Sequence, residues 1–182
     1  TSYCYPISSI GAHVSAIPNH QVNRSTPLAT RANVAAFGTF GYELDLNRLT
    51  AGERQQVREQ IAFMKQYRAV LQFGDFYRLR SPFQGNFTAW MSVSPDRRTA
   101  LVGWYRTLSE ANGPFRRVRL RGLDPDLCYT VDGGQPHYGD ELMRIGLITT
   151  DSGAGECQPG ERPICDFDSH IFVLEAYEEK NT

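Results

Sequence analysis

Long apolar segments are missing from this 182-residue sequence. It contains no run of about 18 apolar residues, which argues against a membrane-spanning helix, and no basic and apolar leader that would indicate export. A strong overall charge is missing as well, because the formal net charge is −1 and creates no field that favours nucleic acid or a membrane surface. We therefore expect a cytoplasmic protein with no nucleic-acid or membrane partner. What the sequence does contain, 41% hydrophobic and 12% aromatic residues, is typical of a globular fold.

Closely spaced cysteine pairs are also absent. The four cysteines, Cys4, Cys128, Cys157 and Cys165, form no Cys-x-x-Cys pair, which argues against a zinc ribbon or a thioredoxin-like redox site. Cys157 and Cys165 flank a loop rich in proline and glycine and lie close enough in sequence to pair, but no pattern requires a disulfide. We expect four reduced thiols, as is usual in the cytoplasm.

Residues 1–74 show helical periodicity with one short apolar strand. Residues 7–17 mix Ile, Val and Ala with Gly and Ser, as in a strand that is buried on both faces of a parallel sheet. Thr26 and Pro27 predict the N-cap and the first position of a helix. Gly38 predicts the end of that helix.

The strongest helix signal follows. Thr50 and Glu53 form a capping box, which predicts a helix over residues 51–72. The apolar residues of this helix fall into two neighbouring stripes. They are Val57, Ile61, Met64 and Leu71 in one stripe, and Phe63, Tyr67 and Val70 in the other. Such a broad apolar arc must be covered from two sides.

Residues 75–182 have the alternating pattern of short strands separated by turns. The predicted strands are residues 76–81, 88–94, 100–107, 116–121 and 171–177. Short strands at regular spacing, with further turns between them, predict an antiparallel β-sandwich. Residues 151–163, rich in Gly, Pro and charge, predict an exposed insertion loop.

A series of motifs links this chain to a known family. They are residues 11–21 (GAHVSAIPNHQ), 37–46 (FGTFGYELDL), 60–63 (QIAF), 73–79 (FGDFYRL), 88–91 (TAWM), 139–143 (GDELM) and 172–176 (FVLEA). Together they resemble the last part of bacterial α-galactosidases of glycoside hydrolase family 36. The resemblance covers nearly the whole chain, with its motifs in matching order.

The resemblance implies a fold and an activity. Residues 1–74 would be the last βα unit of a TIM-type (β/α)8 barrel, and residues 75–182 the C-terminal antiparallel β-sandwich domain, so that the fold is α+β by content. The parent protein would be a retaining glycosidase, without a cofactor, that releases terminal α-linked galactose from oligosaccharides such as melibiose and raffinose. Its partners would be the rest of the catalytic barrel, galactosides, and further copies in a homo-oligomer.

Both catalytic carboxyl groups of such an enzyme are missing from the chain. The family carries its nucleophile as an Asp in a Lys-Trp-Asp motif, and neither Lys65 nor Lys180 precedes a tryptophan. The acid/base Asp of the family belongs shortly before the stretch that matches residues 3–6, upstream of Thr1. Because a retaining glycosidase needs both groups, we expect this chain to be inactive alone and Thr1 to be a processing or cloning boundary. We therefore name no catalytic, substrate-binding, cofactor or metal residue.

In a TIM-type barrel, the residues at the carboxyl end of a strand face the substrate. His13, Asn19 and His20 are candidates for the rim of the pocket. We favour a structural interpretation, in which His13 is a hydrogen-bonded core histidine and Asn19 and His20 shape the loop after Pro18.

Three other groups suggest weaker hypotheses. They are a basic strand (Arg116, Arg117, Arg119, Arg121), an alternating acidic group (Asp166, Asp168, His170) and a set of aromatics (Tyr77, Trp90, Trp104, Tyr105). We interpret the arginines as a solvated or interdomain face rather than a phosphate site, because stacking aromatics are not interleaved with them. The acidic group has too few ligands for a metal. Aromatics at strand spacing more often fill a core than stack on sugars.

The sequence also allows two functions other than that of an enzyme segment. A stand-alone carbohydrate-binding module would need aromatics that face solvent on one sheet. A nucleic-acid binder would use the basic strand.

Overall fold

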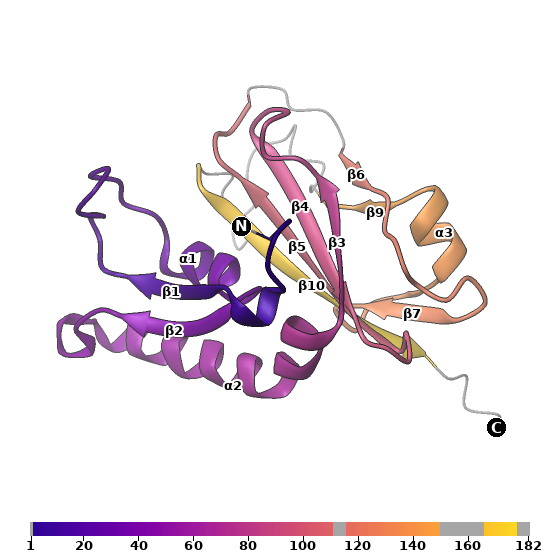
Figure 1. Cartoon of the computed structure of the whole chain (residues 1–182), viewed down its shortest axis with the longest axis horizontal. Coiled ribbons are helices and arrows are strands. Elements are labelled where there is room, and N and C mark those ends of the chain that lie inside the picture. Colours follow the sequence, from indigo (N-terminus) through magenta and orange to yellow (C-terminus); the bar gives the residue numbers. More distant parts are fainter. Residues whose placement is uncertain (1, 111–115, 150–165, 178–182) are drawn as a thin grey trace. The chain divides into compact units, whose positions relative to one another are not determined.

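The chain folds as two compact units, residues 1–74 and residues 75–182 (Figure 1). The computed structural model describes residues 2–110, 116–149 and 166–177. The predicted insertion loop, with Cys157 and Cys165, lies outside these residues, so neither its exposure nor the pairing of the two thiols is tested. None of the helices in the described ranges has both the length and the apolar character that crossing a bilayer requires.

The first unit contains two consecutive βα units. Its elements are η1 (Ile7–Ser9), β1 (Gly11–Ser15), α1 (Leu28–Ala35), β2 (Thr39–Glu43), η2 (Leu46–Arg48) and α2 (Ala51–Phe73). Strands β1 and β2 pair in parallel, with Gly11 opposite Thr39 and Ser15 opposite Glu43. The prediction of a single strand before residue 74 is therefore wrong, because β2 is a second strand that α1 connects to β1.

Gly38 has a different role from the predicted one. Helix α1 ends at Ala35 with Ala36 as its C-cap, and Gly38 begins the approach to β2. A Cβ atom on Gly38 would lie 2.7 Å from the Cβ of Ala12 and 2.8 Å from the carbonyl oxygen of Ile10. Glycine is therefore needed here because the backbone passes so close to β1. At the other end of α1, Pro27 occupies the N-cap position, one residue earlier in the helix than predicted.

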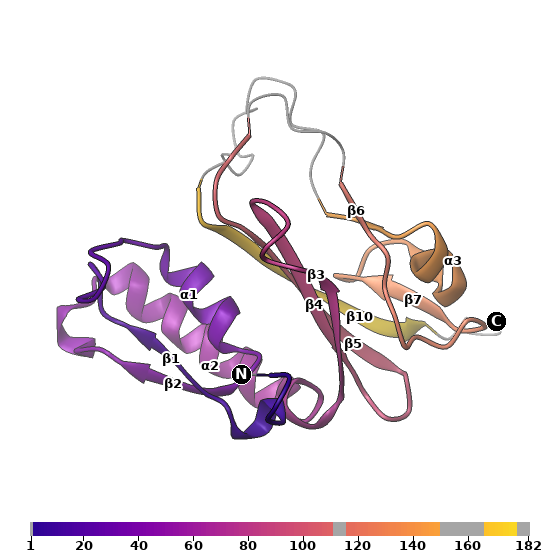
Figure 2. The same ribbon diagram turned by 45° about the horizontal axis from the view of Figure 1, so that its top comes forward.

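Both helices of the first unit cover the same face of the two strands (Figure 2). The buried cluster between the helices and the strands consists of Val14, Leu28, Ala32, Ala35 and Val57. Strand side chains alternate between the two faces of a sheet, so the residues on either side of Val14 point away from the helices.

Helix α2 begins with the predicted capping box, which is confirmed. The hydroxyl of Thr50 accepts a hydrogen bond from the backbone N–H of Glu53 at 3.2 Å, and the Glu53 carboxylate accepts one from the N–H of Thr50 at 2.8 Å. Of the first predicted apolar stripe, Val57, Met64 and Leu71 are buried. The fourth residue of that stripe, Ile61, is 37% exposed, so the described residues do not fully cover the helix at this position.

The second unit is built on one antiparallel sheet. Its elements are β3 (Asp75–Arg80), β4 (Phe87–Val93), β5 (Thr99–Arg106), β6 (Arg117–Val118), β7 (Cys128–Val131), β8 (Pro136–Tyr138), α3 (Gly139–Arg144), β9 (Leu147–Ile148) and β10 (Asp168–Tyr177). Six strands form the sheet in the order β3-β4-β5-β10-β7-β8, and β6 and β9 pair as a separate ribbon. The antiparallel sheet agrees with the prediction, but its partner layer is small.

The core of the second unit lies between the sheet and that small layer. The ribbon β6–β9 and helix α3 lie on the same side of the sheet (Figures 1 and 2). They contribute Val118, Leu142 and Leu147 to a buried cluster with sheet residues such as Met91 and Leu174. The predicted strand over residues 116–121 pairs only at Arg117–Val118, and the short strands β7, β8 and β9 were not predicted.

The buried side chain of Tyr129 in β7 makes hydrogen bonds to the backbone of two other segments. Its hydroxyl accepts a hydrogen bond from the N–H of Asp124 at 3.0 Å and donates one to the carbonyl of Arg97 at 2.6 Å. Tyr129 is fully buried, so loss of its hydroxyl would leave two backbone groups without a partner.

We expect Tyr129→Phe to lower the free energy of unfolding of this unit by about 1–3 kcal/mol, because two buried polar groups lose their partner. Urea unfolding followed by tryptophan fluorescence measures this, since both tryptophans lie in strands β4 and β5 of this unit. The matched control is Tyr138→Phe, whose side chain is 57% exposed and should change the value by less than about 0.5 kcal/mol. Equal effects of the two substitutions would contradict this account of Tyr129.

Candidate functional site

The polar side chains of the first unit gather on the face of β1 and β2 that points away from the helices, here called the inner face. Ala12 and Val14 of β1 and Phe40 and Tyr42 of β2 pack with the helix layer. The alternate residues therefore occupy the inner face. They are Gly11, His13 and Ser15 from β1, and Thr39, Gly41 and Glu43 from β2.

The side chains of His13 and Glu43 are in contact on this inner face. The Nε2 atom of His13 lies 2.5 Å from a carboxylate oxygen of Glu43, and the two side chains are 53% and 71% exposed. The interpretation of His13 as a core histidine is wrong, because its ring is half exposed and its partner is a carboxylate. Glu43 was not singled out in the sequence, because recognising its position requires knowing that residues 39–43 form a strand.

The loop after β1 is shaped by its own backbone and by Asn19. The side-chain oxygen of Asn19 accepts hydrogen bonds from the N–H groups of Gln21 at 3.0 Å and Val22 at 3.2 Å. His20 is exposed on this loop. The guanidinium of Arg31 in α1 donates to the carbonyl of Ser15 at 2.5 Å and so holds the end of β1. The structure thus gives Asn19 the loop-shaping role expected of it.

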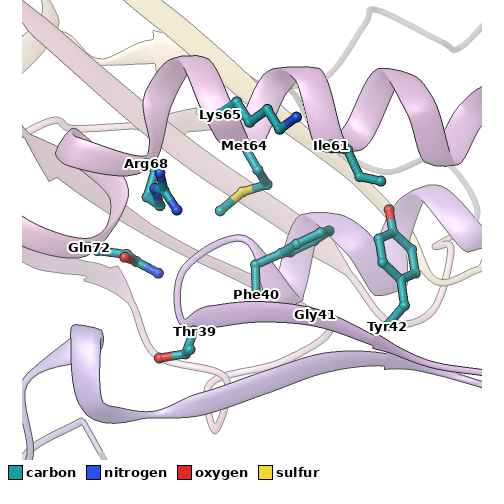
Figure 3. Close-up of a pocket in the computed structure, with 9 residues that line it drawn as sticks. All are labelled: Thr39, Phe40, Gly41, Tyr42, Ile61, Met64, Lys65, Arg68 and Gln72. Atoms are coloured by element: carbon teal, nitrogen blue, oxygen red, sulfur yellow. The ribbon is translucent and has the colours of Figure 1, made fainter.

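A groove of about 410 Å³ runs between β2 and α2 (Figure 3). It is lined by Thr39, Phe40, Gly41, Tyr42, Ile61, Met64, Lys65, Arg68 and Gln72. Four consecutive residues of β2 line it, although their side chains alternate between two faces. The groove therefore follows the edge of the strand, and this is the edge that does not pair with β1.

The floor of the groove is apolar and aromatic. The rings of Phe40 and Tyr42 meet edge to face at 5.3 Å, and the Tyr42 hydroxyl donates to the side chain of Gln60 at 2.8 Å. Burial raises the pKa of Tyr42 to about 12, so it remains a neutral donor at physiological pH. Figure 3 shows Lys65 and Arg68 on the helix side of the groove. The groove therefore combines aromatic side chains from β2 with apolar, cationic and amide side chains from α2.

The second unit separates the residues of the alternating acidic group. Asp168 pairs with Arg106 at 3.2 Å, His170 pairs with Asp132 at 2.8 Å, and the Asp166 carboxylate accepts a hydrogen bond from the N–H of Ser109. Each group therefore has its own partner and they do not converge. The described residues contain no cluster of three or more metal-ligating side chains.

The four aromatics of the possible sugar platform lie on two different faces of the sheet. Tyr77 and Trp104 pack in the core cluster, whereas Trp90 and Tyr105 lie on the opposite face and stack on each other at 4.3 Å. Tyr105 is only 5% exposed, and burial raises its pKa well above the usual value. These residues do not form one exposed aromatic surface, which argues against a sugar platform built from them.

One of the four arginines in the predicted basic strand is paired with a carboxylate. Arg116 pairs with Glu110 and lies 5.7 Å from the ring centroid of Phe87, while Arg117, Arg119 and Arg121 are exposed. No aromatic side chain alternates with these arginines along the chain, so the arrangement lacks the stacking surface of a single-strand nucleic-acid site.

Each of the two units matches a known protein-family model. Residues 1–74 match the family model described as Melibiase, and residues 87–174 match the glycosyl hydrolase family 36 C-terminal domain. This chain belongs to glycoside hydrolase family 36. The match extends across its parallel βα units and its antiparallel domain.

Other members of family 36 resemble this chain closely. It is 54% identical over 147 residues to the α-galactosidase AgaA of Geobacillus stearothermophilus, and 45% identical over 148 residues to α-galactosidase 1 of Pediococcus pentosaceus. Both alignments cover 81% of this chain but only 20% of the relative. The chain thus spans about a fifth of the length of these relatives.

Solved structures agree with this family assignment. Superposed on this chain, the crystal structure of an AgaA variant in complex with raffinose gives a TM-score of 0.87 at 47% sequence identity. The alignment covers 97% of this chain and 23% of the AgaA chain. The crystal structure of the α-galactosidase from Lactobacillus brevis gives a TM-score of 0.88 at 41% sequence identity. That alignment covers 100% of this chain and 24% of the Lactobacillus brevis chain. Each unit therefore has the fold of the corresponding part of family 36 α-galactosidases.

Stability of the family 36 C-terminal domain should depend on pH through Asp132. Burial, the largest single effect, raises the pKa of this carboxyl, but hydrogen bonds from His170 and from the N–H of Val173, with the charge of His170, together lower it. A carboxyl with a lowered pKa in the folded state stabilises the fold above its unfolded pKa of about 3.9. That stabilisation is lost as the pH falls through the folded value.

We therefore expect Asp132→Asn to lower the midpoint of urea unfolding at pH 6 and to have little effect near pH 2, where the wild-type carboxyl is also protonated. Urea titrations at a series of pH values provide the measurement. Asp126→Asn is the control, because Asp126 lies on an exposed turn. A loss at pH 6 that persisted unchanged at pH 2 would show that charge is not the cause.

Proposed function

We propose that this chain is the C-terminal part of an α-galactosidase that releases terminal α-linked galactose from oligosaccharides. The observation that carries the proposal is the match over both units, at 54% identity over 147 residues to AgaA. Structures of AgaA variants that share this fold are described as complexes with raffinose and stachyose, which suggests the substrate class.

The catalytic carboxyl groups belong, in this proposal, to the part of the enzyme outside this chain. A retaining glycosidase needs two carboxyl groups about 5–5.5 Å apart. The described inner face of β1 and β2 offers one carboxylate, Glu43, and that carboxylate is paired with His13. The inner face of the described residues therefore offers no second carboxylate, and we expect the chain by itself to be inactive.

The role of residues 1–74 is to complete the catalytic barrel. Parallel sheets with helices on one face are covered on the other face as well, and their strands pair on both edges when a barrel closes. Within the described residues of the first unit, both helices pack on the other face of the strands, and β2 pairs with β1 alone. These features support the rest of the barrel as the partner of this chain. A homo-oligomer of the complete enzyme is part of the same proposal.

The activity is tested on the full-length gene product and on residues 1–182 alone. With p-nitrophenyl α-galactoside and raffinose as substrates, we expect the full-length protein to release galactose and residues 1–182 to release none. The same proteins are titrated calorimetrically with millimolar raffinose. Light scattering on the full-length sample reports its oligomeric state.

The controls separate the hypotheses. A full-length protein that folds but cleaves no α-galactoside would contradict the proposed activity. Hydrolysis by residues 1–182 alone would contradict the placement of the catalytic carboxyls elsewhere. Sugar binding by residues 1–182 without hydrolysis would instead favour a carbohydrate-binding module.

The open groove generates a separate prediction about assembly. Ile61 is 37% exposed in the groove, so Ile61→Asp should lower the stability of residues 1–182 by only about 1–2 kcal/mol, through lost apolar burial and lower helix propensity. In the full-length protein a neighbouring strand would bury this position, and an unpaired buried carboxylate should cost about 3 kcal/mol or more. Thermal unfolding of both proteins measures the contrast. Gln55→Asp, at an exposed position of the same helix, is the control. Equal effects of Ile61→Asp in both proteins would show that nothing covers the groove.

A further inference from the structure

The small layer of the second unit consists of two neighbouring segments, residues 117–127 and helix α3 with β9 (Figures 1 and 2). At the start of α3, the N–H of Gly139 donates to the carbonyl of Leu127 at 2.8 Å. Farther along the helix, the N–H of Leu120 donates to the carbonyl of Leu142 at 3.1 Å. The two segments therefore run side by side in opposite directions and form one layer. The exposed side chains of this layer are here called its outer surface.

One end of the outer surface, here called the arginine end, is positively charged and partly apolar. Val118 and Leu120 belong to the core cluster, so the residues that alternate with them point outward. These are Arg117, Arg119 and Arg121, all of which are exposed. Ile148 lies opposite Arg117 in the β6–β9 pair and is 48% exposed, and Ile145 is 55% exposed. Arginine is enriched in protein interfaces, and apolar side chains form their centres.

The other end of the outer surface, here called the acidic end, is negatively charged. Asp124 and Asp126 flank Pro125 on the turn that follows the arginines. The N–H of Asp140, in the first turn of α3, donates to the carbonyl of Pro125 at 3.3 Å, so its carboxylate joins the other two. Helix α3 has six residues and a length of about 9 Å, so the two oppositely charged ends are neighbours on one surface.

We propose that this outer surface binds the same surface of a second copy of the chain, with the arginine end of each copy on the acidic end of the other. A two-fold axis brings the same patch of both subunits together. A patch whose two ends carry opposite charges is complementary to itself in that arrangement, and such charges select partner and register. A polyanion such as nucleic acid would instead meet like charge at the acidic end. This inference deepens the homo-oligomer of the proposed function and rests on that part of it alone.

The test reverses the charge of each end in the full-length gene product. One variant combines Arg117→Glu, Arg119→Glu and Arg121→Glu, so that both ends are acidic. The other combines Asp126→Lys and Asp140→Lys, so that both ends are basic. Each variant alone should associate about 100-fold more weakly than the wild type, because like charges then face each other across the two-fold axis. An equimolar mixture should regain the association, because both contacts then join opposite charges. Sedimentation velocity measures each variant and the mixture.

Two further measurements serve as controls. The variant with Arg48→Glu, Arg54→Glu and Arg58→Glu, three exposed positions of the first unit, carries the same change in net charge and should associate as the wild type does. The wild type itself should associate roughly tenfold more weakly when NaCl is raised from about 0.05 M to about 0.5 M, because salt screens exposed charges. This second readout requires no substitution and decides the inference if a variant does not fold.

Each outcome supports or overturns the inference. Variants that associate as tightly as the wild type, a mixture that does not regain association, or association that is independent of salt would overturn it. A monomeric wild type that is retained on heparin through the three arginines would overturn it in favour of a polyanion site. A monomeric wild type that cleaves α-galactosides would overturn it together with the homo-oligomer and leave the proposed activity intact. Charge-dependent association of a wild type that cleaves no α-galactoside would support the inference and refute the activity.

Discussion

The requirement that a parallel sheet be paired and covered on all sides governs the first unit. Two strands with helices on one face satisfy only part of that requirement. The helix side is apolar and closed, with Val14 fully buried. The other side carries the paired side chains of His13 and Glu43, and the outer edge of β2 lines the groove between β2 and α2. These features are those expected of a section of a larger closed sheet.

The second unit is not subject to that requirement, because an antiparallel sheet needs only one face packed on a core. Its antiparallel sheet has one face packed against a small layer, and that layer supplies Val118, Leu142 and Leu147 to the core. The edge strand β8 begins with Pro136, a residue tolerated on edge strands because it has no N–H to pair. Gly139 at the start of α3 allows the backbone to pass so close to Asp124 that a Cβ atom would lie 1.9 Å from its carbonyl oxygen.

Sequence patterns predicted the features that depend on local chemistry. The capping box of α2 and the alternating strands β3, β4 and β5 were found because their residues are sufficient to specify them. Strand β2 was missed because Thr39-Phe-Gly-Tyr-Glu43 is short, contains glycine and follows Gly38, so it resembles a connection between helices. Its identity as a strand comes from pairing with β1, which is a tertiary contact. The residues of β6 and β9 are too few to show any period.

The candidate site shows the same division between local and tertiary information. The loop role of Asn19 could be predicted because it concerns bonds within three residues. The partner of His13 could not, since Glu43 is 30 positions away and becomes its neighbour only when two strands align in parallel register.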